Sequence, residues 1–235
     1  MLETILEYER TLFLWLNGGH TLYWDHFFWI YSGKMVWIPL ALFVLWVICY
    51  KRPWKESLLI LLFIALTLTL CDQFASSVCK PLFTRLRPTR HPDFMHHVQT
   101  VISPLTGSPY LGGRYGFISS HAANAFGFAT FTILLFRYRW YTYNVILWAI
   151  LMSYTRIYLG VHFISDIIPG ILSGCFFGWL SFEIYRVIRS RTIKGVGESS
   201  LLSYKVTHVR AILYAMWVTI AFILVYSGLG VPAWK

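Results

Sequence analysis

Three short segments of the sequence combine cationic, hydroxyl, imidazole and carboxylate side chains within otherwise apolar surroundings. They are KPLFTRLRP at residues 80–88, ISSH at 118–121 and TRIYLGVHFISD at 155–166. Placing one charged side chain at the centre of a membrane helix costs about 2.5 to 3.5 kcal/mol. Such a concentration of charge therefore indicates a function, and a group of cations needs an anion to hold it together. Phosphate is the anion that these side chains complement best.

The cations of these segments are suited to holding a phosphoryl group. Lysine and the forked guanidinium of arginine complement its non-bridging oxygens and stabilise the charge of its transition state. Ser119 and Ser120 open an apolar segment, where backbone N–H groups and the positive end of a helix dipole add further donors. The residues that we predict to bind phosphate are Lys80, Arg87, Ser119, Ser120 and Arg156.

The two histidines are candidates for covalent and acid–base chemistry. His162 and Asp166 are four residues apart, so they share one face of a helix. The carboxylate can accept the Nδ1 proton, fix the tautomer and leave Nε2 as a nucleophile. His121 is suited to protonating the leaving oxygen as a general acid. Taken alone, His162 and Asp166 would more simply be a buried pair joining helices, but the other two segments favour catalysis.

The composition is that of an integral membrane protein. The chain has 235 residues, of which 57% are hydrophobic and 13% charged, more apolar residues than one soluble core of this length can bury. The acidic N-terminus MLETILEYER does not resemble a cleavable signal peptide. The net charge of +10 comes from residues at the ends of apolar segments and within 80–114. This placement indicates topology signals and phosphate ligands, and it argues against a nucleic-acid partner.

We expect an all-α membrane protein with six transmembrane helices, because each span needs about 20 mainly apolar residues. The expected spans are 34–50, 57–79, 119–136, 141–157, 163–186 and 211–229. Residues 1–33 would form an interfacial segment that begins with an amphipathic helix, with Leu6, Leu12 and Phe13 on its apolar face. Within a single membrane domain, 57–185 would form the catalytic helix core and 187–210 a cytoplasmic linker.

Lys and Arg residues indicate the orientation in the membrane. They are concentrated in the first, third and fifth connections, which the positive-inside rule places in the cytoplasm. The three polar segments then meet at the outer ends of the helices. We therefore expect a multi-pass protein of the bacterial inner membrane whose site faces the periplasm or the exterior.

Together, the three polar segments resemble the signature of the type-2 phosphatidic acid phosphatase superfamily, KxxxxxxRP, PSGH and SRxxxxxHxxxD. The matching positions are Lys80, Arg87, Pro88, Ser119, His121, Arg156, His162 and Asp166. Three positions depart from the pattern: Ile118 replaces Pro, Ser120 replaces Gly and Thr155 replaces Ser. The resemblance covers roughly residues 57 to 185.

The resemblance implies a mechanism. His162 attacks phosphorus to give a phosphohistidine, His121 protonates the departing oxygen, and Asp166 orients His162. Water then releases phosphate, and neither a metal nor another cofactor is required. The cations and Ser119 hold the phosphoryl oxygens throughout.

The implied partners are the bilayer and a lipid whose phosphate reaches the site while its tail stays in the membrane. Undecaprenyl diphosphate is the favoured substrate, because an outward-facing site suits the recycling of a lipid carrier. Phosphatidylglycerophosphate and lipid A are the alternatives within the superfamily. Two other classes stay open: a lipid phosphotransferase that passes the phosphoryl group to a second lipid, and a lipid-binding or transport protein without catalysis.

Other polar residues are given less specific interpretations. Arg85, Arg90 and Arg114 are interpreted as solvated or facing lipid headgroups, with substrate recognition by one of them as the alternative. The group His91, Asp93, His96 and His97 has no recognisable ligand spacing, so we assign no metal site to it. Asp72 lies within the second expected span, and the hypothesis for it is a pairing with a cation of the bundle.

Overall fold

The computed structural model describes residues 2–193 and 204–229, which form helices and loops without a β-strand. The helices are α1 Leu2–Asn17, α2 Leu22–Ser32, η1 Met35–Trp37, α3 Ile38–Cys49, α4 Trp54–Gln73, η2 Phe74–Cys79, α5 Lys80–Phe83, η3 Pro88–Arg90, η4 Met95–His97, α6 Ser120–Phe136, α7 Arg139–Tyr158, α8 Ile164–Thr192 and α9 Val206–Leu229. The expectation of an all-α fold is therefore confirmed for this part of the chain.

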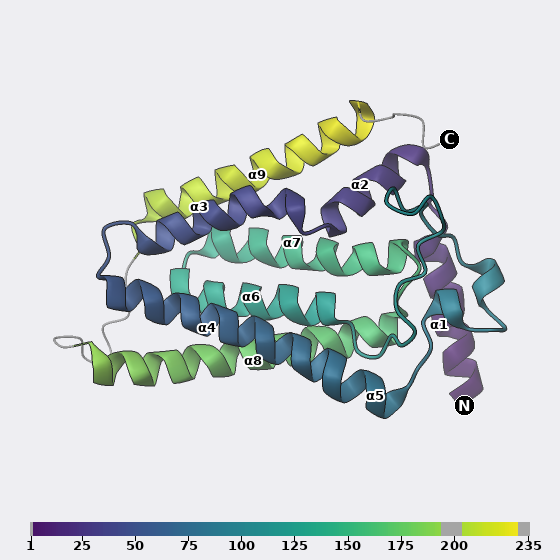
Figure 1. The fold of residues 1–235 in the computed structure, drawn as a ribbon, viewed down its shortest axis with the longest axis horizontal. Helices are drawn as coiled ribbons and strands as arrows, with labels where there is room; N and C mark the ends of the chain where they lie inside the picture. The colour runs from purple at the N-terminus through teal and green to yellow at the C-terminus, as the bar shows by residue number, and fades with distance from the viewer. Residues whose placement is uncertain (1, 194–203, 230–235) are drawn as a thin grey trace.

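The long helices form a bundle that is covered at one end by the N-terminal helix. In Figure 1, α3, α4, α6, α7, α8 and α9 run side by side, and α1 lies across one end of them. The loop that joins α5 to α6 lies at the same end as α1. Polar residues of the loop and the first turns of α6 and α8 are thereby brought to one end of the bundle.

Only part of the expected set of six spans is visible as separate membrane-length helices. Among the described residues, Trp54–Phe83, Ile164–Thr192 and Val206–Leu229 are long and apolar enough to cross a membrane. The pair Leu22–Ser32 and Met35–Cys49, bent by 63°, makes a fourth if it counts as one span. The helix α6 is shorter, with 17 residues, and α7 falls outside this group. The structure supports a membrane protein, and the number six stays a prediction.

Two helices extend beyond the expected spans. The helix α8 continues to Thr192 and α9 begins at Val206, so both ends of the linker expected at 187–210 are helical. The basic residues that end the apolar stretch are good helix formers, and the helix continues past the point where hydropathy falls. Residues 194–203 of that linker lie outside the described residues.

A stripe of glycines lets α6 and α8 approach closely. Gly170, Gly174 and Gly178 of α8 face α6, and a Cβ atom on Gly170 would lie 2.8 Å from the Ser119 carbonyl oxygen. Small residues at four-residue spacing allow helix backbones to meet in this way. The Ser119 N–H donates to the backbone oxygen of Asp166 at 3.0 Å. Helix packing therefore joins the second polar segment to the third.

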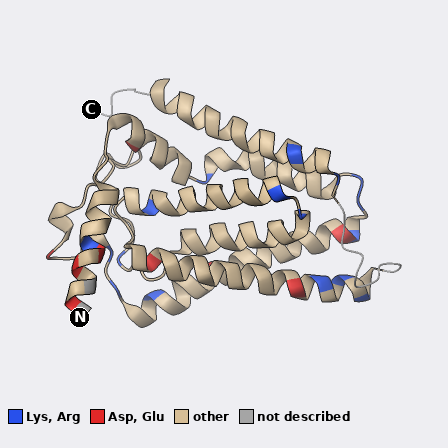
Figure 2. Ribbon diagram, turned by 180° about the vertical axis from the view of Figure 1, so that it is seen from behind, with Lys and Arg blue, Asp and Glu red and all other residues tan. Residues whose placement is uncertain are grey.

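The far end of the bundle is held by a buried ion pair. Glu56 of α4 accepts a hydrogen bond from Arg189 Nε at 2.6 Å and one from the Tyr185 hydroxyl at 2.7 Å. Figure 2 places several Lys and Arg residues at this end, away from α1. The distribution agrees with the expected cytoplasmic side, and the orientation itself stays a prediction.

The side of α1 that faces the protein is more polar than expected. Phe13 is fully buried, as expected, but Leu6 and Leu12 of the expected apolar face are 38% and 48% exposed. Asn17 is buried instead, and its amide donates to the carbonyl oxygens of Ile157 and Tyr158 at 3.2 and 2.9 Å. Hydrogen bonds to the last two carbonyl groups of α7 thus draw this polar residue inward. The placement of α1 at the membrane interface stays a prediction.

Candidate active site

The loop between α5 and α6 fixes Arg87 in a buried position. Arg87 Nε donates to the Tyr115 carbonyl oxygen at 3.1 Å, and the Gly116 N–H donates to the Arg85 carbonyl oxygen at 2.8 Å. The Thr89 hydroxyl donates to the carbonyl oxygen of Leu111 at 2.8 Å. These bonds between two stretches of the loop hold the guanidinium against the end of the bundle.

Arg87 meets His162 directly. Its Nη1 atom donates to His162 Nε2 at 3.0 Å and to the Val161 carbonyl oxygen at 2.9 Å. The chain reaches His162 through a tight turn at Gly160, whose φ is +73° and where a Cβ would lie 2.7 Å from Val98 Cγ1. Glycine tolerates both conditions. The turn after α7 thus delivers a buried imidazole to the cation from the first polar segment.

Asp166 holds the other side of the imidazole. Its Oδ2 atom lies 3.4 Å from His162 Nδ1 and accepts the Phe163 N–H at 3.0 Å. His162 and Asp166 are therefore in contact, but they do not share a helix face, because His162 precedes α8 and Asp166 lies in its first turn. Since Nδ1 faces the carboxylate, Nε2 is the nitrogen directed at the cations. This is the orientation that a nucleophilic histidine needs.

The second polar segment joins the same group of contacts. Ser119 caps α6, and its hydroxyl accepts the Ala122 N–H at 3.4 Å. Lys80 follows the π-helical segment η2, and its Nζ atom donates to the Ser120 hydroxyl at 3.4 Å and to the Ser76 hydroxyl at 3.1 Å. The structure thus links Lys80 to the start of α6, as the predicted phosphate site requires.

Arg156 lies in the last turn of α7 and is 3% exposed. It donates to the hydroxyl groups of Ser32 and Tyr110, the latter at 3.2 Å, and its Nε atom has no hydrogen-bond partner. None of the ion pairs within residues 2–193 and 204–229 involves Lys80, Arg87 or Arg156. Three cations without an ion-pair partner are what the predicted phosphate site requires, and their binding of phosphate stays a prediction.

His121 opens onto a largely apolar cavity of about 430 Å³. Ser120, Lys34 and Asp72 line the same end of it, and apolar residues of α3, α4, α6, α7 and α9 line the remainder. The cavity reaches Tyr141, whose hydroxyl donates to Thr132 near the other end of α6. Asp72 takes part in no ion pair of the described residues, but its charge acts on Lys80, so its pairing with a cation stays a hypothesis.

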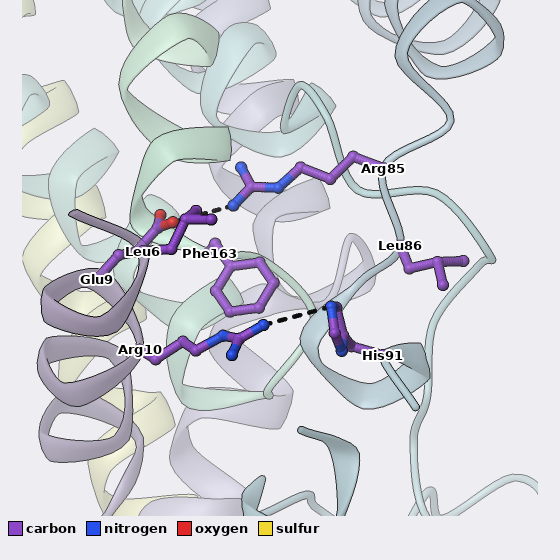
Figure 3. Close-up of a pocket in the computed structure, with 7 residues that line it drawn as sticks. All are labelled: Leu6, Glu9, Arg10, Arg85, Leu86, His91 and Phe163. Carbon is purple, nitrogen blue, oxygen red and sulfur yellow. Dashed lines mark hydrogen bonds and ion pairs between the residues drawn. The ribbon is translucent and has the colours of Figure 1, made fainter. Parts of the chain in front are cut away.

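Sequence reasoning missed two residues of this region. Arg85, interpreted as facing solvent or headgroups, donates to Asp166 Oδ1 at 2.9 Å and to Glu9 Oε2 at 3.0 Å. Glu9 belongs to α1 and received no assignment. Both line a pocket of about 330 Å³ together with Arg10 and His91 (Figure 3). The position of Arg85, two residues before Arg87, was an available signal, and Glu9 had none.

The group His91, Asp93, His96 and His97 lies just before and within η4. His91 contacts Arg10, with 3.5 Å between Nε2 and Nη2, and His96 and His97 are exposed. Among the described residues, no three His, Cys, Asp or Glu side chains are grouped as metal ligands.

A helical membrane bundle that carries an imidazole, its carboxylate and unneutralised cations at one end has the features of a membrane phosphatase. The model of the PAP2 superfamily matches residues 57–190, more than half of the chain, and the protein belongs to this superfamily. It is a membrane lipid phosphatase of the PAP2 type, acting on phosphoric esters. The resemblance noted in the sequence is confirmed, and the individual roles of the site residues stay predictions.

Three characterised relatives carry names of lipid phosphatases. A lipid A 4'-phosphatase of Porphyromonas gingivalis is 44% identical over 81% of this chain and 78% of its own length. A lipid A 4'-phosphatase of Bacteroides thetaiotaomicron is 36% identical over 97% of this chain and 98% of its own. An undecaprenyl-diphosphatase of Sulfolobus acidocaldarius is 28% identical over 66% of each chain.

Two solved structures share the fold. A PAP2-type phosphatidylglycerolphosphate phosphatase from Bacillus subtilis superposes with a TM-score of 0.54 at 18% identity, over 82% of this chain and 90% of the other. LpxE from Aquifex aeolicus gives a TM-score of 0.50 at 24% identity, over 74% of this chain and 93% of the other. These similarities support the helical architecture described above.

Proposed function

We propose that this protein removes the 4'-phosphate of lipid A through a phosphohistidine on His162, at the outer face of a bacterial inner membrane. The contact between His162 Nε2 and Arg87 supports the chemistry, because it directs a nitrogen lone pair into the group of unneutralised cations. The two relatives named lipid A 4'-phosphatases support the substrate. The substrate favoured in the sequence analysis, undecaprenyl diphosphate, is supported only by a relative of lower identity and coverage.

The proposed reaction has two steps. In the first, the Nε2 lone pair forms a bond to phosphorus while the bond to the sugar oxygen breaks, and His121 gives that oxygen a proton. Asp166 accepts the Nδ1 hydrogen bond and stabilises the positive charge on the imidazole. In the second step, His121 takes a proton from water, the hydroxide attacks phosphorus, and the P–N bond breaks to restore His162 and release phosphate.

The cations have a separate task in both steps. Lys80, Arg87 and Arg156 would contact the non-bridging oxygens, whose charge increases or spreads in each transition state. Because these cations have no carboxylate partner among the described residues, no ion pair must break before phosphate enters. Water-excluded surroundings strengthen their attraction for the phosphoryl group.

The substrate proposal is tested by phosphate release from purified protein in detergent. Lipid A, undecaprenyl diphosphate and phosphatidylglycerophosphate would be compared, each with and without EDTA, and lipid products would be assigned by ³¹P NMR and tandem mass spectrometry. We expect the highest kcat/KM for lipid A, loss of the 4'-phosphate, and no effect of EDTA. A higher kcat/KM for undecaprenyl diphosphate would overturn the proposed substrate, and transfer of the phosphate to a second lipid would indicate a phosphotransferase.

The acid side of the pH profile follows from the surroundings of His162. Burial, followed by the charges of Arg87 and Arg156, lowers the pKa of His162 well below its usual value. Burial also lowers the pKa of Arg87, to about 10, which leaves this residue charged at neutral pH. A lowered pKa keeps the nucleophile unprotonated in mild acid, so kcat/KM should fall only below about pH 6.5. The profile would be corrected for substrate ionisation measured by ³¹P NMR, and an acid limb of kcat/KM that lies above pH 6.5 would contradict this assignment.

The cavity beside His121 is expected to take part of a lipid tail. Leu68→Trp places a larger side chain into its α4 wall, and overpacking of this kind costs about 1–3 kcal/mol, or roughly tenfold to a hundredfold in kcat/KM for a full-length lipid. Turnover of p-nitrophenyl phosphate, which has no tail, should be unchanged. The matched control is Leu62→Trp on the same helix, where the side chain is 59% exposed. An equal loss with both substrates would show that the tail lies elsewhere.

A further inference from the structure

The Arg85 guanidinium bridges two carboxylates that are far apart in the sequence. Its Nη1 atom donates to Asp166 Oδ1 at 2.9 Å, and its Nη2 atom donates to Glu9 Oε2 at 3.0 Å. Nη1 also contacts the Ser165 hydroxyl. Figure 3 shows the Arg85 and Glu9 side chains turned toward each other at the edge of the pocket. A chain of contacts therefore runs from α1 to the carboxylate that holds His162.

Glu9 is held as firmly as Arg85. Its second oxygen, Oε1, accepts the Ser165 N–H at 2.8 Å, in the first turn of α8. The Glu9 side chain is 13% exposed and that of Arg85 28%. The Phe163 ring lies 4.8 Å from the Arg85 guanidinium carbon. A carboxylate with two directed partners fixes both the position of the guanidinium and the first turn of α8.

The charge of Glu9 affects the balance between the two cationic groups that attract the Asp166 carboxylate. Asp166 has two cationic partners during the proposed reaction, Arg85 and the imidazolium that forms on His162. An Arg85 without Glu9 would attract the Asp166 carboxylate more strongly and leave it less able to stabilise His162. Glu9 offsets part of the Arg85 charge and so keeps Asp166 available to the imidazole.

We propose that Glu9 and Arg85 are positioning residues of the phosphatase site, and that α1 contributes to catalysis by setting the orientation and charge balance of Asp166. The proposal rests on the proposed role of His162 as nucleophile. It adds to the catalytic machinery a residue that lies outside the segment matched by the superfamily model, which begins at residue 57.

Attachment of α1 alone does not account for the bridge, because other contacts already hold this helix. Phe13 is fully buried and lies 5.7 Å from the ring of Phe94 and 5.4 Å from that of Phe163. Asn17 donates to three backbone carbonyl oxygens. Removal of the Glu9 charge should therefore leave α1 in place and change the reaction.

The test compares Glu9→Gln with Glu7→Gln, the same substitution on an exposed position of the same helix. With p-nitrophenyl phosphate, Glu9→Gln should lower kcat about tenfold to a hundredfold, the range found for outer-shell partners of metal ligands. KM and the melting temperature should stay unchanged, because Glu9 neither touches the substrate nor is needed to attach α1. Glu7→Gln should match wild type in all three quantities.

A double-mutant cycle tests whether Glu9 acts through Arg85. Arg85→Met should lower kcat at least as much as Glu9→Gln, and the double variant should be no worse than Arg85→Met, since Glu9 then has nothing to act on. Additive losses would overturn the coupling. Wild-type kcat in Glu9→Gln, or a loss that only follows a lower melting temperature, would overturn the positioning role.

The pH profile of kcat/KM should shift if Glu9 acts through its charge, and it should stay unchanged if Glu9 only attaches α1. The groups that face His162 are Asp166, Arg85, Arg87, Arg156, Lys80 and His121. Without the negative charge of Glu9, the positive charge of Arg85 acts more strongly on His162 and lowers its pKa further. The acid limb of kcat/KM should therefore move to lower pH. Arg85→Met removes a cation and should move the limb to higher pH. Shifts of the same sign in both variants would contradict the proposed charge balance.

The choice of p-nitrophenyl phosphate separates this test from the substrate proposal. Wild-type turnover of this compound without release from lipid A would overturn the proposed substrate and leave the comparison of Glu9→Gln with Glu7→Gln intact. Full turnover by His162→Ala would instead overturn the nucleophile and, with it, the positioning role.

Discussion

His162→Ala is expected to abolish phosphate release, with kcat lower by about 10⁴- to 10⁶-fold. The Nε2 atom of this residue lies 3.0 Å from Arg87 and is the only partner in the proposed first step that forms a bond to phosphorus. Rapid mixing with p-nitrophenyl phosphate should give a burst of p-nitrophenolate in the wild type and none in the variant. Quenching of the wild-type reaction in alkaline detergent should trap a phosphorylated protein that is stable to base and loses its phosphate in acid.

His96→Ala is the matched control for the nucleophile. His96 lies in η4, is exposed, and contributes to no part of the proposed site. Its activity and burst should equal those of the wild type. Retention of the burst by His162→Ala would show that another group, or water itself, attacks phosphorus.

His121→Ala is expected to lower kcat for lipid A by about 10²- to 10⁴-fold, the usual contribution of a general acid and base. The sugar oxygen is a poor leaving group without a proton, whereas p-nitrophenolate leaves as the anion. The variant should therefore keep the p-nitrophenolate burst and lose the steady-state rate, because His121 is still needed to activate water in the second step.

The two histidine variants thus give opposite pre-steady-state behaviour. His162→Ala should lack the burst, and His121→Ala should retain it with accumulated phosphoenzyme. Rates for alkyl phosphates should fall more steeply with leaving-group basicity in His121→Ala than in the wild type. An equal dependence on the leaving group in both proteins would show that His121 donates no proton to the departing oxygen.

The central contacts of the site were predictable because the motifs impose them locally. His162 and Asp166, four residues apart, lie 3.4 Å from each other, although His162 precedes α8 and only Asp166 belongs to the helix. The link between Lys80 and Ser120 follows from helices that end at one side of a membrane. In both cases a charged side chain within an apolar stretch costs free energy. Its presence therefore indicates a functional site even when the fold is unknown.

The bridge from α1 could not be predicted by the same reasoning. Helix-face patterns assign polar residues to solvent, and the other acidic residues of the same helix, Glu3 and Glu7, are exposed. Its inward position is decided by Arg85, 76 positions later in the chain. A contact between a helix face and a distant loop leaves no periodic pattern in the sequence, so it is visible only in the folded structure.

The number of membrane spans was difficult to predict from the sequence, because hydropathy does not describe every helix of the bundle. The helix α7 carries Arg139, Asn144 and Arg156, and its polar residues reduce its hydropathy although Arg156 is buried. The expected first span, 34–50, corresponds to Met35–Cys49, and a bend of 63° separates it from Leu22–Ser32. Site-building residues and helix breaks both weaken the hydropathy signal that defines a span.

If the cavity takes the lipid tail, as proposed, its walls separate the residues that react from those that select the lipid. Residues 57–190, which define the superfamily, contain the motif residues and supply the α4, α6 and α7 walls. The facing walls come from α3 and α9, which lie outside that segment and carry no motif residue. Substitutions in these two helices can reshape the space for a lipid tail while the reacting groups stay in place. Evolution can therefore adapt one hydrolytic centre to new lipids by changing helices that take no part in the hydrolysis.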